Sequence, residues 1–229
     1  MPTLDDNLAA FWRSALRCEE CATLAPWRKF PPAARGNPRH GVKILGEAPG
    51  RVSLDHGRPF SNPRSLTVRN ALARAVAPQV IEPEAMLYFS DAVKCWPSSP
   101  SGANRSPRAA ESRRCADLHL TRELAIIRPK VIFAFGVRAV SALLDRPVKL
   151  AEVHGRAIAH PNGYRVIPLM HPSTINIAGM RRIGMRTVAD YEAHLATLFR
   201  RELTEAGRLQ HDELPGAVGT GRQFPDRGG

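Results

Sequence analysis

The sequence predicts an α/β protein, built as a three-layer α/β/α sandwich around a central four-stranded parallel sheet. The main evidence is that short apolar runs of strand length alternate along the chain with longer segments of helical periodicity. Because parallel neighbours need long crossovers, which helices usually supply, we expect helices on both faces of the sheet. With 229 residues and 43% hydrophobic content, the chain is long enough to bury a substantial core.

Four apolar runs have the length and composition of buried strands: residues 42–45, 86–90, 130–135 and 164–170. Five segments are predicted helices: residues 5–16, 65–77, 107–127, 137–144 and 187–202. In the third helix Ala116, Leu120, Leu124 and Ile127 recur at helical spacing and mark one buried face. We expect one domain over residues 1–203 and an irregular C-terminal tail over residues 204–229, because the tail is rich in Gly, Pro and charge.

Small and polar residues follow the predicted strands. In parallel α/β sheets ligands bind beyond the carboxyl ends of the strands, so these residues are the first candidates for a functional site. They are Gly46-Glu47-Ala48-Pro49-Gly50, Asp91, Gly136 and His171-Pro172-Ser173. By residue type alone, Glu47 also suits a helix cap, and His171 also suits an N-cap or a surface position.

The charge of the chain indicates a polyanionic partner. Lys and Arg number 33 against 21 acids, which gives a formal net charge of +12, and such a field attracts nucleic acid. No apolar run approaches the roughly 20 residues that span a bilayer, and residues 1–7 carry acids where a secretory signal carries lysines. We therefore expect a cytoplasmic monomer that binds nucleic acid and not membranes.

Four cysteines form a candidate metal site. Cys18 and Cys21 are a C-x-x-C pair, Cys95 follows a predicted strand, and Cys115 lies in the long third helix. Disulfides are not expected in a reducing cytosol, whereas four thiolates suit zinc or an iron–sulfur cluster. A zinc ribbon normally has two close pairs and this chain has only one, which favours iron–sulfur; plain buried thiols remain the alternative.

Several motifs, in this order, resemble the iron–sulfur (family 4) uracil-DNA glycosylases over roughly residues 18–173. Residues 46–50 resemble the first active-site motif of that family, and Gly57-Arg58-Pro59-Phe60 follows at its spacing. The matching segments further along are Asp91-Ala92-Val93-Lys94-Cys95, then Pro107, Glu111 and Cys115, then residues 128–132 with Gly136, and His171-Pro172-Ser173. The resemblance implies a uracil-DNA-glycosylase-like domain.

The resemblance also implies roles for individual residues. Cys18, Cys21, Cys95 and Cys115 would bind one [4Fe–4S] cluster of structural type. Glu47 would act on water or on the sugar, and His171 would hydrogen-bond the O2 atom of the departing base. The other implied substrate-binding residues are Ala48, Pro49, Gly50, Phe60, Asp91 and Ser173, with Phe60 stacking on the extruded base. An unrelated phenylalanine at that position would simply be a core residue.

An apolar tip followed by arginines comes after the second active-site motif. Ile177 and Met180 precede Arg181 and Arg182, a pattern that suits a wedge filling the vacated base stack beside a phosphate clamp. Together with Arg58, these are the candidate DNA-binding residues. An arginine run is otherwise most often a solvated face.

Two departures from the family pattern affect these roles. Ser53 and Leu54 stand where the family has two acids, which puts water activation by that loop in doubt. Asp91 stands where the family has the asparagine that reads the base edge, and an ionised aspartate can only accept hydrogen bonds. Either Asp91 is protonated by burial, or the preferred base differs, or another group reads uracil; a fourth option is that Asp91 points elsewhere.

The leading hypothesis is a monofunctional uracil-DNA glycosylase, a hydrolase that flips out and excises uracil or another deaminated base and so initiates base excision repair. Its partner would be DNA containing uracil or an abasic site. The main alternative is a DNA-binding repair protein that recognises the same lesions with little or no turnover. A weaker alternative is a zinc-stapled basic domain without a base pocket.

Overall fold

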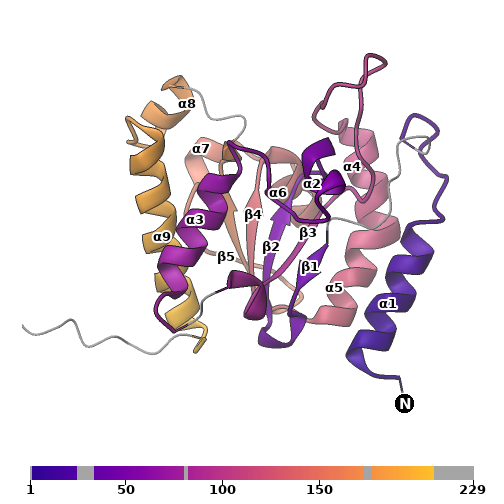
Figure 1. The fold of residues 1–229 in the computed structure, drawn as a ribbon, viewed down its shortest axis with the longest axis horizontal. Coiled ribbons are helices and arrows are strands. Elements are labelled where there is room, and N and C mark those ends of the chain that lie inside the picture. The colour runs from indigo at the N-terminus through magenta and orange to yellow at the C-terminus, as the bar shows by residue number, and fades with distance from the viewer. Residues whose placement is uncertain (1, 25–33, 80–81, 173–176, 209–229) are drawn as a thin grey trace, which may run out of the picture.

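A mixed sheet forms the centre of the molecule. The computed structural model describes residues 2–24, 34–79, 82–172 and 177–208, and within them the sheet has six strands in the order β1-β3-β2-β4-β6-β5. The four inner strands are parallel to their neighbours: β3 (Tyr88–Asp91), β2 (Val42–Gly46), β4 (Val131–Phe135) and β6 (Arg165–Leu169). The predicted α/β class and its four-stranded parallel centre are confirmed (Figure 1).

Two short edge strands were not predicted. β1 (Arg35–Gly36) pairs antiparallel with β3, and β5 (Ile158–Ala159) pairs antiparallel with β6. Each has only two residues, so neither leaves a pattern of alternation in the sequence.

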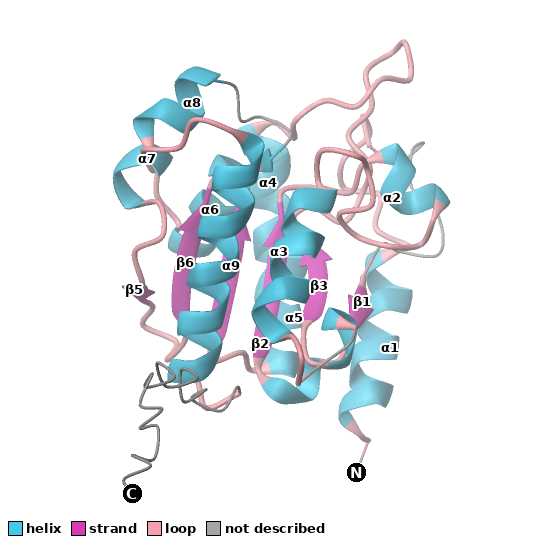
Figure 2. Cartoon of the chain, turned by 60° about the vertical axis from the view of Figure 1, so that its left-hand side comes forward, coloured by secondary structure: helices cyan, strands magenta, loops and turns pink. Residues whose placement is uncertain are grey.

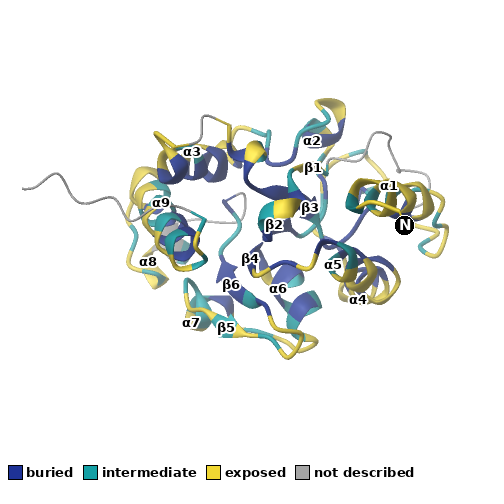
Figure 3. Cartoon of the chain, turned by 90° about the horizontal axis from the view of Figure 1, so that it is seen from below, coloured by how far each residue is buried: buried dark blue, intermediate teal, exposed yellow. Residues whose placement is uncertain are grey.

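Helices cover both faces of the sheet. On one face lie α3 (Leu66–Val76) and α9 (Val188–Glu205). On the other lie α4 (Ala109–Cys115), a π-helical turn η4 (Ala116–Leu120), α5 (Thr121–Ile127), α6 (Val137–Leu144) and α7 (Leu150–Val153). α1 (Leu4–Ala15) packs outside α5. Figure 3 shows buried residues concentrated on the strands and on the helix faces that meet them.

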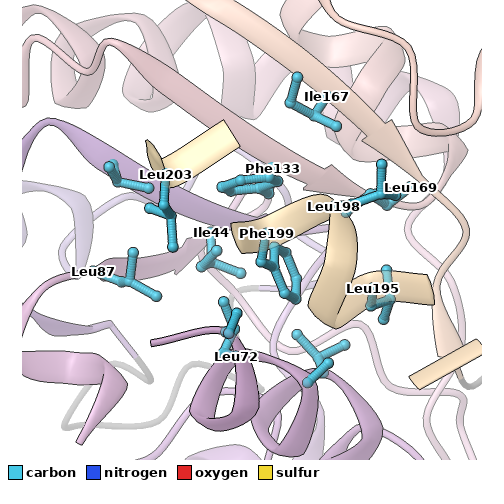
Figure 4. Close-up of a cluster of buried hydrophobic side chains, with 14 of the residues drawn as sticks. Ile44, Leu72, Leu87, Phe133, Ile167, Leu169, Leu195, Leu198, Phe199 and Leu203 are labelled. Atoms are coloured by element: carbon cyan, nitrogen blue, oxygen red, sulfur yellow. The ribbon is translucent and has the colours of Figure 1, made fainter. Parts of the chain in front are cut away.

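The strands divide their side chains between the two layers. Along β4, Phe133 and Phe135 enter the core under α3 and α9, whereas Ile132 and Ala134 enter the core under α4 to α6. The first core is the larger, and Phe133 meets Phe199 of α9 edge-on with ring centroids 4.8 Å apart (Figure 4). Period-two alternation on a doubly covered sheet accounts for the continuous apolar runs seen in the sequence.

The predicted helices are observed with ends shifted by a few residues at most. The predicted helix over residues 107–127 begins at Ala109 and runs through α4, η4 and α5, with Ala116, Leu120 and Ile127 buried and Leu124 partly buried. α9 continues to Glu205, and residues 209–229 of the predicted tail lie outside the described residues. Among the described helices, none combines the length and apolar character needed to cross a bilayer.

The remaining short helices flank the strands. Near the amino ends of β2 and β3 are η2 (Pro38–His40) and η3 (Pro83–Ala85), while α2 (Arg51–Asp55) follows β2 and α8 (Ile177–Arg182) comes after β6 in the chain. Figure 2 shows α2, α7 and α8 at the end of the sheet to which the parallel strands point. The predicted site residues lie at this end.

Candidate active site and cysteine pocket

A cavity of about 480 Å³ opens at the carboxyl ends of β2, β3 and β6, where α/β sheets bind ligands. It is called the strand-end pocket below. Its lining includes seven residues predicted from the sequence: Glu47, Ala48, Pro49, Gly50, Phe60, Asp91 and His171. The strands therefore bring together side chains that are up to 124 positions apart in the chain.

Glu47 is held by the start of α6. Its Oε1 atom accepts a hydrogen bond of 3.0 Å from the backbone N–H of Arg138. Gly136 makes this approach possible, because a Cβ atom there would lie 2.3 Å from Oε1 of Glu47. Burial raises the pKa of Glu47, although the Arg138 N–H opposes the shift. The carboxylate thus lines the pocket and accepts a hydrogen bond from the first turn of α6. It does not cap the next helix in the chain, α2, which was the alternative interpretation.

Asp91 ends β3 beside Gly46 of β2, its partner in the ladder. A Cβ atom at position 46 would lie 2.1 Å from Oδ1 of Asp91 and 3.4 Å from the ring of Phe60, so glycine is required where these side chains enter the pocket. Burial raises the pKa of Asp91 to about 7, against the opposing effect of Lys94 and Lys43. Near neutral pH the carboxyl group is therefore divided between its neutral and ionised forms.

Phe60 and His171 form one wall of the strand-end pocket. Their rings stack at 24° with centroids 5.9 Å apart, and Phe135 supports Phe60 edge-on at 5.4 Å. Phe60 has a φ of +54°, which is rare for a bulky residue and is found mainly where function constrains the backbone. Burial lowers the pKa of His171 to about 4, so its ring is neutral at physiological pH.

Two loops that sequence reasoning did not assign also line the strand-end pocket. One contributes Asn62, Pro63, Arg64 and Ser65, and the other contributes Asn104, Arg105, Ser106 and Pro107. The Oδ1 atom of Asn104 accepts hydrogen bonds from Trp96 Nε1 (2.6 Å) and from the Arg51 backbone (3.1 Å). No local pattern in the sequence of residues 97–107 reveals a hydrogen bond across the loop.

Ser53 and Leu54, the two positions at which the resembled family has acids, lie in α2. Ser53 lines the strand-end pocket, while Leu54 packs against the buried Trp96. Asp55, one position later, pairs with Arg51 at 3.5 Å and is exposed. Leu54 therefore serves the packing of the loop that carries Asn104, which explains an apolar residue at this position.

The candidate DNA-binding residues are not gathered in the strand-end pocket. Arg58 forms ion pairs with Glu84 (2.9 Å) and Glu82 (3.1 Å), while Arg181 and Arg182 are exposed in the last turn of α8. Ser173 lies outside the described residues, and for Ile177 and Met180 only the backbone in α8 is described.

The four cysteines line a second pocket, called the cysteine pocket. Cys18 and Cys21 lie in the turn after α1, Cys95 in the loop after β3 and Cys115 at the end of α4, and none forms a disulfide. The backbone N–H of Lys94 donates to Sγ of Cys115 at 3.3 Å. In the described part of the chain, no three Cys, His, Asp or Glu side chains are grouped tightly enough to hold a single metal ion.

His119 also lines the cysteine pocket. The π-helical turn η4 directly after Cys115 carries it, and its side chain is 94% buried, with 6% exposed. Neither of its ring nitrogens has a hydrogen-bond partner among the described residues. A buried imidazole without a partner is costly, so this wall of the pocket suits a ligand that accepts a hydrogen bond.

A buried charge network lies between the two pockets. The fully buried carboxylate of Glu123 on α5 pairs with Lys43 Nζ (3.2 Å) and with Lys94 Nζ (2.7 Å). Burial would raise the pKa of Glu123, but the two lysines outweigh it and hold the pKa at about 2. Lys94 also donates to the backbone carbonyl of Asp91. Lys94 thus contacts Asp91, which lines the strand-end pocket, and also Cys115, which lines the cysteine pocket.

Comparisons with known proteins agree with this geometry. Residues 33–193 match the model of the uracil DNA glycosylase superfamily. A Type-4 uracil-DNA glycosylase of Pyrobaculum aerophilum is 30% identical over 143 residues, covering 61% of this chain and 67% of that protein. Proteins of the same name from Saccharolobus solfataricus (26% over 175 residues; 73% and 76% covered) and Archaeoglobus fulgidus (29% over 186 residues; 76% and 84% covered) are also similar.

Proposed function

The chain belongs to the uracil-DNA glycosylase superfamily, and from this premise we propose that it is a monofunctional DNA glycosylase that hydrolyses the N-glycosidic bond of uracil flipped out of DNA. This reaction would initiate base excision repair. The observation that carries the proposal is that Glu47, Phe60, Asp91 and His171 line one pocket at the strand ends. Similarity to Type-4 uracil-DNA glycosylases supports the same reaction.

The wall formed by Phe60 and His171 suits an extruded pyrimidine. A flipped base is held by stacking on an aromatic side chain and by hydrogen bonds to its edge. Phe60 is fixed by its buried neighbours Phe135 and Phe89, so its ring is a rigid surface. A rigid surface loses little conformational entropy when the base stacks on it.

His171 is the proposed stabiliser of the leaving group. As the glycosidic bond breaks, negative charge develops on the base, and a preorganised donor at O2 lowers the barrier. Because burial holds the pKa of His171 near 4, the neutral ring donates one N–H without itself carrying a charge. The product base would therefore leave as an anion hydrogen-bonded to His171.

Glu47 is the proposed group that orients and activates water. Burial raises its pKa, which makes the carboxylate a better proton acceptor. The hydrogen bond from the Arg138 N–H fixes the carboxylate with respect to the sheet. The same negative charge would stabilise cationic character on the sugar.

Asp91 is the proposed reader of the base edge. In its neutral form a carboxyl group donates one hydrogen bond and accepts another, as an asparagine amide does. It would then donate to O4 and accept from N3–H of uracil. The pKa of Asp91 near 7 supports the first interpretation of this departure, namely protonation by burial.

The exposed Arg181 and Arg182 of α8 are the proposed phosphate contacts. Arg58, by contrast, is engaged by two glutamates. We assign it to the packing of the loop that carries Phe60, which revises its proposed role in DNA binding.

We also propose that the cysteine pocket holds a [4Fe–4S] cluster through Cys18, Cys21, Cys95 and Cys115. All four thiols line one pocket, and the buried N–H of His119 there needs an acceptor. When bound, the cluster would tie the turn after α1 to α4 and to the loop after β3. Ultraviolet–visible spectra with iron and sulfide analysis test it.

The alternative, lesion recognition with little turnover, has one specific observation in its favour. Ser53 lines the strand-end pocket where a second acid would otherwise stand, so Glu47 alone must act on water. If Glu47 is insufficient, the protein would bind uracil or abasic DNA without release of the base.

Excision assays on defined oligonucleotides test the proposed function. Duplexes and single strands containing uracil, hypoxanthine, xanthine or cytosine are incubated with the purified protein and then treated with alkali to cleave abasic sites. We expect strand breakage with uracil and its loss in Glu47→Gln, which keeps an acceptor for the Arg138 N–H. Tight binding of uracil DNA without breakage would support the alternative.

A further inference from the structure

The residue before His171 is held in an unusual way. Met170 lies beyond the last ladder pair of β6 with β4, which joins Leu169 to Phe135. Neither its backbone N–H nor its carbonyl pairs with a neighbouring strand. Its N–H donates to Nδ1 of His154 (3.2 Å), and its carbonyl accepts from the hydroxyl of Tyr191 (2.5 Å). Side chains thus replace the sheet where the ladder ends.

His154 lies beside the end of β6, beyond the part of that strand that pairs with β5. β5 pairs with β6 only as far as Val166, after which the N–H of Gly155 donates to the carbonyl of Pro168 at 2.9 Å. The ring of His154 then lies beside Met170, at the position where a further residue of a neighbouring strand would pair. Burial lowers the pKa of His154 to about 4, with His194 contributing in the same direction, so the ring is neutral. The hydrogen bond from the Met170 N–H then assigns the tautomer in which Nδ1 accepts and Nε2 carries the hydrogen.

Tyr191 comes from the opposite layer. It lies in the first turn of α9, is 1% exposed and belongs to the larger core. The start of α9 is fixed by Thr187 and Asp190, whose side chains cap it reciprocally. The Tyr191 ring lies 5.9 Å from that of His154, which also stacks on His194 at 5.3 Å. Both partners of Met170 are therefore rigidly placed.

We propose that His154 and Tyr191 are positioning residues that clamp Met170 and thereby hold the His171 ring against Phe60 in the strand-end pocket. The residue after His171 is Pro172, which has no N–H to anchor. Met170 therefore anchors the backbone directly before His171. This inference rests on the proposed function for its effect on catalysis, but the clamp itself is a property of the protein without DNA.

Three variants test the clamp. His154→Leu removes the acceptor with similar volume, whereas His154→Asn keeps an oxygen acceptor at the position of Nδ1; Tyr191→Phe removes only the hydroxyl. The matched controls are His160→Leu and Tyr164→Phe. His160 Nδ1 also accepts a backbone N–H at 3.2 Å, from Asn162, and it stacks on Tyr164 away from the pocket. His160 Nε2 also lies 3.1 Å from the Leu143 carbonyl oxygen. His160→Leu therefore reports the cost of losing histidine ring contacts elsewhere, and Tyr164→Phe reports the cost of removing a tyrosine hydroxyl outside the pocket.

The first readout is the histidine ring spectrum of the protein without DNA, measured by long-range proton–nitrogen NMR. We expect the His171 signals to shift and broaden in His154→Leu and Tyr191→Phe, to recover in His154→Asn, and to stay unchanged in both controls. The second readout is steady-state excision of uracil, where kcat should fall about 10- to 100-fold, the scale for misplaced catalytic groups. KM should change less than about twofold, because contacts with DNA remain.

Each outcome decides one of the two proposals. Unchanged His171 signals in both His154→Leu and Tyr191→Phe would overturn the clamp, as would equal losses of kcat in His154→Leu and His160→Leu. If the unmodified protein excises no uracil, the proposed function fails, and the ring spectra alone still decide whether the clamp orients His171.

Discussion

The strand-end pocket and the cysteine pocket differ in how they are built. The strand-end pocket takes its titratable groups from the ends of three parallel strands, and burial there moves the pKa of Asp91 to about 7 and that of His171 to about 4. The cysteine pocket takes its thiols from the turn after α1, the loop after β3 and the end of α4. The first is part of the sheet, whereas the second joins peripheral segments to it.

From this difference we expect the strand-end pocket to serve catalysis and the cysteine pocket to serve stability. Groups with displaced pKa values in a cavity are typical of chemistry, and the sheet holds them in place. Around the cysteine pocket the same segments are also linked by the packing of α1 on α5 and by the hydrogen bonds from Arg114 to the Glu20 carbonyl (2.7 Å) and from Thr23 to Glu111 (3.1 Å). Substitutions in the cysteine pocket should therefore mainly lower stability, whereas substitutions in the strand-end pocket should mainly slow excision.

The largest expected effect is on stability, at the cysteine pocket. Cys115→Ser should lose iron and sulfide and destabilise the protein by about 4 kcal/mol or more, the range for loss of a metal site. Urea unfolding and metal analysis measure this. Ser112→Ala, one turn earlier in α4 and equally buried, is the control and should cost less than about 1 kcal/mol. Full iron content in Cys115→Ser would show that the ligand set is wrong.

The next effect is on chemistry, at the strand-end pocket. His171→Leu keeps the volume of the ring and removes its donor, so single-turnover excision of uracil should slow about 100- to 1000-fold. Its urea unfolding should stay within about 1 kcal/mol of the unmodified protein, and His160→Leu should excise uracil at the normal rate. If His171→Leu excises uracil normally, another group stabilises the leaving base.

Most of the fold was predictable because the elements are long and periodic. Strands such as β4 are continuous apolar runs, and the stripe from Ala116 to Ile127 marked the helix behind them. The edge strands β1 and β5 were not predictable because a pairing of two residues has no period. The π-helical turn η4 was likewise not predictable, because the apolar residues from Ala116 to Ile127 have the spacing of an ordinary α-helix.

The site was predictable where a residue follows a strand or, as with Phe60, lies in a motif that resembles the family. Glu47, Asp91 and His171 were found from their position after a strand. The link from Glu47 to Arg138 spans 91 positions, and the contacts of Asn104 cross a loop of irregular composition. Such contacts depend on the packed structure, and so did the ion pairs that engage Arg58.

A glycine pair tests how closely Glu47 must be placed. Gly136 and Gly163 have similar positive φ angles, +96° and +84°, but a Cβ atom at 136 meets Glu47 whereas one at 163 meets nothing within 4 Å. Both alanine variants should lose about 1–3 kcal/mol of stability through backbone strain. Only Gly136→Ala should also slow excision, by about 100-fold. Equal rates in the two variants would show that excision does not require the observed placement of Glu47.

The last expected effect concerns pH and the base reader. Because the pKa of Asp91 is raised to about 7, its neutral form dominates below pH 7 and its ionised form above. Uracil needs a donor at O4, so kcat/KM for uracil should fall as the pH rises through 7, by up to about tenfold per unit. Asp91→Asn keeps a donor and an acceptor at every pH and should abolish this decline.

The pH profiles of Asp91→Asn and of the unmodified protein are measured between pH 5 and 9 on uracil and on cytosine. An ionised Asp91 accepts from an exocyclic amine, so any excision of cytosine should instead increase above pH 7. Lys43 and Lys94 favour the ionised form of Asp91; a decline centred below pH 7 would mean that they offset more of the effect of burial. Identical profiles for the two proteins would show that Asp91 does not read the base.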